Sequence, residues 1–127
     1  MKNTVIVAKR IYAPKDPSDG LRVLVDRLWP RGVTKEAAAL HAWLPDVAPT
    51  AALRSWFRHD PGRYDEFCER YLDELHTVAQ TRAAVVRLAG MAPVGGRLTL
   101  LFGARDEARN NAVVLREHLL GIQRETD

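Results

Sequence analysis

Charged and aromatic side chains crowd together directly after one apolar segment of this 127-residue chain. The apolar run from Val23 to Val25 is typical of a strand that is buried on both faces. It is followed within a few positions by Asp26, Arg27, Trp29 and Arg31. Charged groups at the end of a buried strand cost stability unless they are paired or bind something. The carboxyl ends of parallel strands are also where ligands bind, so this pattern indicates a site.

A second polar stretch follows the apolar run Leu98–Phe102, which predicts another buried strand. This stretch contains Asp106 and leads into a predicted helix over Asn110–Leu120. If the two strands are parallel neighbours, their carboxyl ends meet at one edge of the sheet, which brings Asp106 and Asn110 close to Asp26. The free N–H groups and the dipole at the start of a helix favour an anion there.

The residue types in these two stretches favour the binding of an anion. Arginine binds phosphate or carboxylate with two parallel hydrogen bonds. We therefore expect Arg27 and Arg31 to bind the anion. Trp29 then offers a face for stacking, and Asn110 completes the cradle. Two structural alternatives stay open: the arginines pair with the two aspartates in a structural network, or Asn110 serves only as a helix N-cap.

Acid–base chemistry is the other interpretation of the aspartates. Burial after three aliphatic residues raises the pKa of a carboxyl group, which suits Asp26 to general acid–base work unless an arginine keeps it ionised. Asp26 and Asp106 also make a carboxylate pair for hydrolysis or for Mg²⁺, although no metal-binding motif is present. The stretch 53–61 adds two ligand-binding candidates, Arg54 and His59, and a structural role for His59 beside a helix start is the competing interpretation.

Three strands and five helices are expected to position these residues. The predicted strands are Val5–Tyr12, Leu21–Leu28 and Leu98–Phe102, and the predicted helices are Lys35–Trp43, Ala51–Phe57, a segment that starts at Asp60-Pro61, Gln80–Ala89 and Asn110–Leu120. The long helical crossover between the second and third strands implies that these two strands are parallel. We therefore predict a single α/β domain over residues 1–127, a three-layer Rossmann-like domain with a small, mostly parallel sheet and flanking helices. The pairing direction of the first strand stays open.

The charge of the chain is uneven along its length. Residues 1–35 carry eight basic and three acidic side chains, a net +5, whereas the remainder carries 11 basic and 13 acidic side chains, a net −2. Such a basic segment suits an anionic partner, and solvated loop charges are the alternative. A single cysteine allows no intrachain disulfide, and neither a signal peptide nor a membrane-spanning apolar run is found. These features predict a cytoplasmic protein that does not bind membranes.

Four segments also carry a family resemblance: DGLRVLVDRLWPRGVTK, WLPDVAPTAALRSWFRHDP, EFCERYLDEL and LTLLFGARDEARNNAVVL. Together they resemble the YeaO-like family of small uncharacterised bacterial proteins, which lies within a wider domain family of unknown function. The resemblance extends from Arg10 to Leu120 and implies a cytoplasmic α/β single domain without an established activity. Longer members resemble the strand end Leu24–Asp26 and carry a Cys-His-Arg turn after the last strand. Here that turn, residues 103–112, has neither cysteine nor histidine, which implies lost or different chemistry.

The leading hypothesis is a cytosolic protein that binds a nucleotide, a phosphorylated metabolite or a nucleic-acid end at this edge of the sheet. A hydrolase that uses Asp26 or Asp106 is the second hypothesis. The third is a non-catalytic module whose basic first segment docks onto nucleic acid or onto an acidic protein. The residues identify no cofactor, no metal ion and no oligomeric state.

Overall fold

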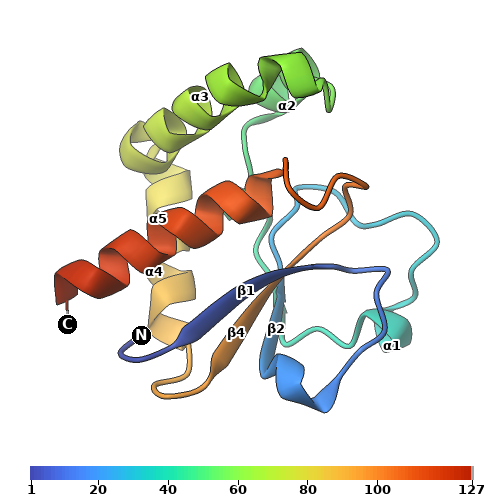
Figure 1. The fold of residues 1–127 in the computed structure, drawn as a ribbon, viewed down its shortest axis with the longest axis vertical. Coiled ribbons are helices and arrows are strands. Elements are labelled where there is room, and N and C mark those ends of the chain that lie inside the picture. The colour runs from blue at the N-terminus through green and yellow to red at the C-terminus, as the bar shows by residue number, and fades with distance from the viewer. Residues whose placement is uncertain (127) are drawn as a thin grey trace.

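The sheet has two inner strands, and each of them has a parallel partner on both sides. The computed structural model describes residues 1–126 and orders its four strands β1-β4-β2-β3 (Figure 1). The strands are β1 (Val5–Arg10), β2 (Leu21–Leu24), β3 (Ala42–Trp43) and β4 (Arg97–Phe102), and every pairing is parallel. The α/β fold and the parallel pairing of β2 with β4 are thus confirmed. The first strand, whose direction the sequence left open, is parallel to β4.

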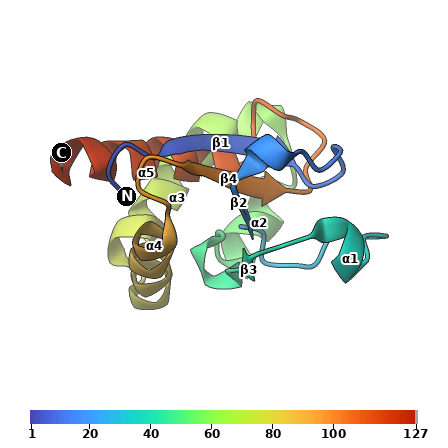
Figure 2. The ribbon, with the colours of Figure 1, turned by 90° about the horizontal axis from the view of Figure 1, so that it is seen from below.

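Five α-helices are described within residues 1–126, and most of them cover one face of the sheet. They are α1 (Lys35–Ala38), α2 (Ala51–Phe57), α3 (Tyr64–Thr77), α4 (Ala79–Met91) and α5 (Asn111–Thr126). Helices α3, α4 and α5 lie on one side of the sheet, whereas α1 lies beyond β2 and β3 on the other side (Figure 2). This arrangement agrees with the predicted three-layer, Rossmann-like architecture. Within residues 1–126, no helix combines the length and the apolar character needed to cross a bilayer.

The alternation of side chains along β2 and β4 divides the core between the two faces. Val23, Leu100 and Phe102 belong to the large cluster under the long helices, which also contains Tyr71 and Leu115. The residues next to them in β2 and β4 point the opposite way into a smaller cluster that consists of Ile11, Leu24, Ala38 and Leu101. Both faces of the middle strands are therefore buried, as their unbroken apolar runs predict.

Several predicted boundaries are wrong: β1 ends at Arg10 and α5 continues to Thr126, and two further errors bear on the site. The predicted helix Lys35–Trp43 ends at Ala38, because Ala39 takes the left-handed conformation with φ of 47°, and Ala42–Trp43 then pair with β2 as a strand. The predicted strand Leu21–Leu28 ends at Leu24, although the Val25 N–H still donates to the Leu101 carbonyl at 3.1 Å. These changes place the residues after Val25 in a loop at the sheet edge.

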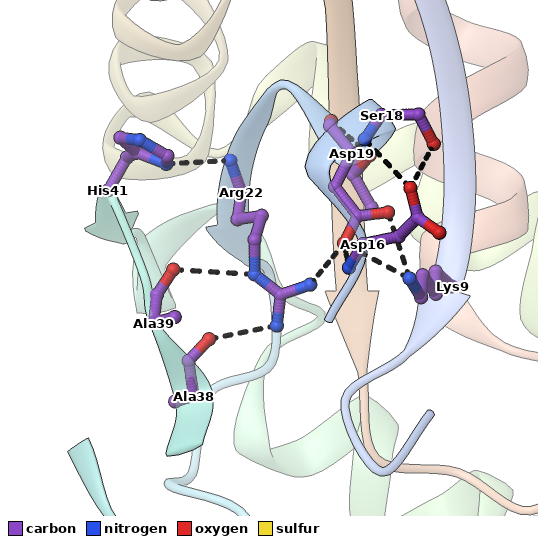
Figure 3. Close-up of polar contacts among 9 residues, drawn as sticks. Lys9, Asp16, Ser18, Asp19, Arg22, Ala38, Ala39 and His41 are labelled. Atoms are coloured by element: carbon purple, nitrogen blue, oxygen red, sulfur yellow. Dashed lines mark hydrogen bonds and ion pairs between the residues drawn. The ribbon is translucent and has the colours of Figure 1, made fainter. Parts of the chain in front are cut away.

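A buried ion-pair network ties β1, β2 and α1 together (Figure 3). The side chain of Arg22 is 3% exposed, and its Nη1 lies 2.5 Å from Asp19 Oδ2. Its Nη2 donates to the Ala38 carbonyl at 2.8 Å, and its Nε donates to the Ala39 carbonyl at 3.3 Å. The ammonium group of Lys9 donates to both oxygens of Asp19, at 2.8 and 3.0 Å. Two of the bases counted in the first segment are thus internal partners and not free surface charges.

The backbone around Asp19 is fastened to β4 as well. Thr99 Oγ1 donates to the Asp19 carbonyl at 2.6 Å, so the loop before β2 is anchored to the central strand. Gly20 follows with φ of 64°, and a Cβ at this position would lie 2.3 Å from the Arg97 carbonyl oxygen. Only glycine fits so close to the neighbouring strand.

We expect Asp19→Asn to lower the free energy of unfolding by about 3 kcal/mol, because it leaves Arg22 buried without its charged partner. Urea denaturation measures this loss. Glu66→Gln is the matched control, since the same change breaks the solvent-exposed Glu66–Arg70 ion pair, which contributes below about 1 kcal/mol. Equal losses in the two variants would contradict a structural role for the buried pair.

The same pair predicts a dependence of stability on pH. Burial alone would raise the pKa of Asp19, but hydrogen bonds from Lys9, the Asp16 N–H and Arg22 hold the pKa below its ordinary value of 3.8. A depressed carboxyl pKa stabilises the fold above pH 3.8, and this contribution is lost as the pH falls through the native pKa. The stability difference between the wild type and Asp19→Asn should therefore shrink below pH 3.8. A constant difference from pH 7 to pH 2.5 would exclude this linkage.

Candidate functional site

A cavity of about 270 Å³ opens at the carboxyl ends of β2 and β4. All but one of the predicted site residues line it, namely Asp26, Arg27, Trp29, Arg31, Arg54, His59 and Asn110. They come from the loop after β2, from α2 and the turn that follows it, and from the start of α5. The exception is Asp106. We refer to this space as the edge cavity.

Asp26 is fixed at the edge cavity by the turn that follows β4. Its Oδ2 accepts a hydrogen bond from the Gly103 N–H at 2.8 Å. A Cβ on Gly103 would lie only 3.3 Å from this oxygen, so glycine permits the close approach of the turn. The Asn111 amide donates to the Val25 carbonyl at 3.0 Å and holds the start of α5 beside the same strand end.

The environment of Asp26 disfavours its charge. Burial raises the pKa of this carboxyl above 3.8, while the Gly103 N–H, the nearby Asn111 amide and the His59 side chain act in the opposite direction. Within residues 1–126, the hydrogen bond of good geometry to this carboxylate is the one from the Gly103 N–H to Oδ2, and the Asn111 amide lies near the same group. Asp26 therefore keeps a free acceptor in a partly buried position.

Arg27 and Trp29 hold the walls of the edge cavity in place. Arg27 donates from Nε to the Pro49 carbonyl at 3.0 Å and from Nη2 to the Ala48 carbonyl at 3.2 Å. Its Nη1 also lies 3.7 Å from a carboxylate oxygen of Asp46. Arg27 thus makes structural contacts, as the alternative interpretation expected. Its partners are these carbonyls and Asp46, however, and not Asp26 or Asp106.

The Trp29 ring is held at two places. Its Nε1 donates to the Val33 carbonyl at 2.7 Å, and its ring meets the edge of Trp43 with 5.5 Å between centroids. The ring therefore has a fixed position while it lines the edge cavity.

Arg31, Arg54 and His59 differ from Arg27 because their polar groups are unengaged. Within residues 1–126, none of the three side chains makes a hydrogen bond or an ion pair, and all three are exposed. The Tyr12 hydroxyl donates to the Arg31 carbonyl at 2.9 Å, so the backbone at this position is fixed even though the guanidinium is free. Two arginines and a histidine are thus available to a ligand.

The backbone that carries His59 is strained. Arg58 and His59 both take the left-handed conformation, with φ of 52° and 55°. Arg58 ends α2 in this way, and its N–H donates to the Arg54 carbonyl at 3.1 Å. Non-glycine residues in this region cost about 1 kcal/mol or more each, and such strain concentrates at functional sites. The strain places the His59 ring on the cavity wall beside Phe57, 5.9 Å away between centroids.

Asn110 and Asp106 serve mainly to start α5. Asn110 Oδ1 accepts from the Val113 N–H at 3.0 Å, and its Nδ2 donates to the Asp106 carbonyl at 2.9 Å, which is the N-cap role that the sequence left open. The Asp106 carboxylate accepts from the N–H groups of Ala108 and Arg109 at 3.0 Å, and these bonds lower its pKa. Asp106 is not among the residues that line the edge cavity, so the cavity does not contain the predicted Asp26–Asp106 pair.

Sequence reasoning missed Tyr12 and Gly103 as parts of this site. Both lie within two residues of a strand end, as Asp26 does, and both line the edge cavity. The missing signal was the strand order: β4 lies between β1 and β2, so three strand ends deliver residues to one place.

We expect Asp26→Asn to raise the free energy of unfolding at pH 7 by about 1 kcal/mol, because the amide fits the same space without a buried charge. A raised native pKa means that the folded state binds the proton more tightly, so wild-type stability falls as the pH rises from 3.8 through the native pKa. The difference in free energy of unfolding between Asp26→Asn and the wild type should therefore disappear at pH 3. Urea denaturation at pH 7 and at pH 3 measures this difference. A variant less stable than the wild type at pH 7 would show that the carboxylate supports the fold.

The comparisons with known proteins agree with the family resemblance. An uncharacterised protein of Mycobacterium tuberculosis strain H37Rv, Rv3073c, is 41% identical over 121 residues, which cover 95% of this chain and 98% of that protein. The uncharacterised protein YeaO of Escherichia coli K12 is 40% identical over 117 residues, which cover 92% of this chain and 98% of YeaO. No solved structure matches the chain significantly. A family model described as the inactive DUF488-N3 subclade matches residues 5–127. The chain therefore belongs to this uncharacterised, YeaO-like family, the inactive DUF488-N3 subclade.

Proposed function

We propose that this protein binds a small anionic metabolite in the edge cavity and does not convert it. The observation that carries the proposal is the pair of unengaged guanidinium groups, Arg31 and Arg54, which reach the same cavity from different segments. A guanidinium group offers a planar array of donors that matches phosphate and carboxylate.

The charge and size of the edge cavity support this proposal. Three arginines line it against one carboxylate, so its net charge favours an anion. The first residue of α5, Asn111, also lies on the wall, which adds the positive end of a 16-residue helix. A volume of about 270 Å³ is near the lower end of ligand pockets, and it suits a sugar phosphate or a mononucleotide better than a dinucleotide.

Binding without turnover is favoured over hydrolysis by two observations. The family is described as an inactive subclade, and Asp106 does not share the edge cavity with Asp26. Docking of the basic first segment onto a nucleic acid has less support, because Lys9 and Arg22 are engaged by Asp19 and Arg10 donates to the Ala104 carbonyl.

We expect Arg31→Ala and Arg54→Ala each to weaken binding of the anionic ligand at least about tenfold, because each removes a charge-assisted contact worth about 1.5–3 kcal/mol. Isothermal titration calorimetry measures this with inorganic phosphate, ribose 5-phosphate and the four nucleoside 5′-monophosphates. A scan of the same compounds for released products tests for turnover.

Arg87→Ala is the matched control, since Arg87 is an exposed arginine of α4 that does not line the edge cavity. This variant should bind as the wild type does. The proposal would be overturned if no compound binds the wild type, if Arg87→Ala loses as much affinity as the two site variants, or if a bound compound is hydrolysed.

A further inference from the structure

The edge cavity offers two opposite kinds of group to a ligand. Arg31 and Arg54 are exposed and bring positive charge to its mouth, whereas Asp26 is partly buried and lies deeper. A ligand that carried only an anionic group would satisfy the arginines and leave the Asp26 carboxylate without a partner. Such a desolvated carboxylate is unfavourable unless the ligand brings it a hydrogen-bond donor.

One oxygen of the Asp26 carboxylate is able to accept a hydrogen bond from a ligand. Oδ2 already accepts from the Gly103 N–H, and the Asn111 amide, which donates to the Val25 carbonyl, lies close to the carboxylate as well. Oδ1 has no hydrogen bond of good geometry from residues 1–126, so it is open to an N–H or O–H group of a ligand. Carboxylates accept hydrogen bonds from the amino groups of nucleobases in the same manner.

The wall beside Asp26 is aromatic and rigid. Trp29 is held by the Val33 carbonyl and by Trp43, and Tyr12 is held through the Arg31 carbonyl. Both rings line the edge cavity. A flat heterocycle gains binding energy by stacking on such a ring, whereas the ring of a sugar has no aromatic face for this contact.

We propose that the ligand is a nucleoside 5′-monophosphate, with its base against Trp29, a base N–H donated to Asp26 Oδ1, and its phosphate held by Arg31 and Arg54. This inference rests on the proposed function and adds the class of ligand to it. The shared requirement is an N–H donor opposite an anion, and an amino sugar phosphate also meets it without an aromatic ring.

The experiment compares phosphate ligands that carry a base, an amino group or neither of these groups. Calorimetric titrations use the four nucleoside 5′-monophosphates, ribose 5-phosphate and glucosamine 6-phosphate on the wild type and on Asp26→Asn, Arg31→Ala and Arg87→Ala. Urea unfolding of Asp26→Asn confirms that this variant folds. At least one nucleotide should bind about tenfold or more tightly than ribose 5-phosphate.

In Asp26→Asn, most of the difference in affinity between the nucleotide and ribose 5-phosphate should vanish. Ribose 5-phosphate should bind this variant at least as tightly as the wild type, because a negative charge has left the cavity. Arg31→Ala should weaken both ligands, and Arg87→Ala should leave both unchanged. Equal binding of ribose 5-phosphate and all nucleotides would overturn the inference and leave the proposed function standing. A nucleotide gain that survives in Asp26→Asn, or glucosamine 6-phosphate that binds as tightly as the best nucleotide, would also overturn it. Absence of all binding would overturn both proposals.

Discussion

The alignment of three parallel strand ends is the constraint on which the rest of this molecule depends. Because β4 pairs with β1 and with β2, Arg10 lies opposite Phe102 and Leu24 lies opposite Leu101. The chain leaves all three strands at nearly the same level. The loops that follow must therefore share one edge of the sheet, and that edge is where the cavity forms. The long helices cover one face of the sheet, and α2 and the start of α5 form part of the wall at this edge.

Charged groups have opposite roles in the two halves of the fold. Beside α1, Asp19 and Arg22 satisfy each other and the surrounding carbonyls, so their burial supports the structure. At the edge cavity, Asp26 is partly buried with one oxygen unused, and Arg58 and His59 hold strained backbone. Stability is given up at the edge cavity, where a ligand is expected to bind, which is a common trade between folding and function.

The sequence predicted what depends on local pattern. The apolar runs at β2 and β4 and the long crossover between them were sufficient for the parallel pairing of these two strands, and the N-cap role of Asn110 was one of two alternatives that the sequence left open. The end of α1 at Ala38 was missed because an alanine-rich stretch gives no signal that Ala39 is left-handed. The partners of Arg22 and Arg27 were also missed, since they are set by tertiary contacts with Asp19, Ala38, Ala48 and Pro49. Pairings of this kind become predictable only when the strand order is known.

The hydrogen bonds from Arg27 to the Ala48 and Pro49 carbonyls affect how the edge cavity binds a ligand. It fastens the loop after β2, which carries Arg31, to the segment that leads into α2, which carries Arg54. The backbones of these two arginines are therefore held at a fixed separation before any ligand arrives. A preorganised site loses less conformational entropy on binding than two independent loops would. The separation of the two backbones then limits the size of the anions that both guanidinium groups are able to contact at once.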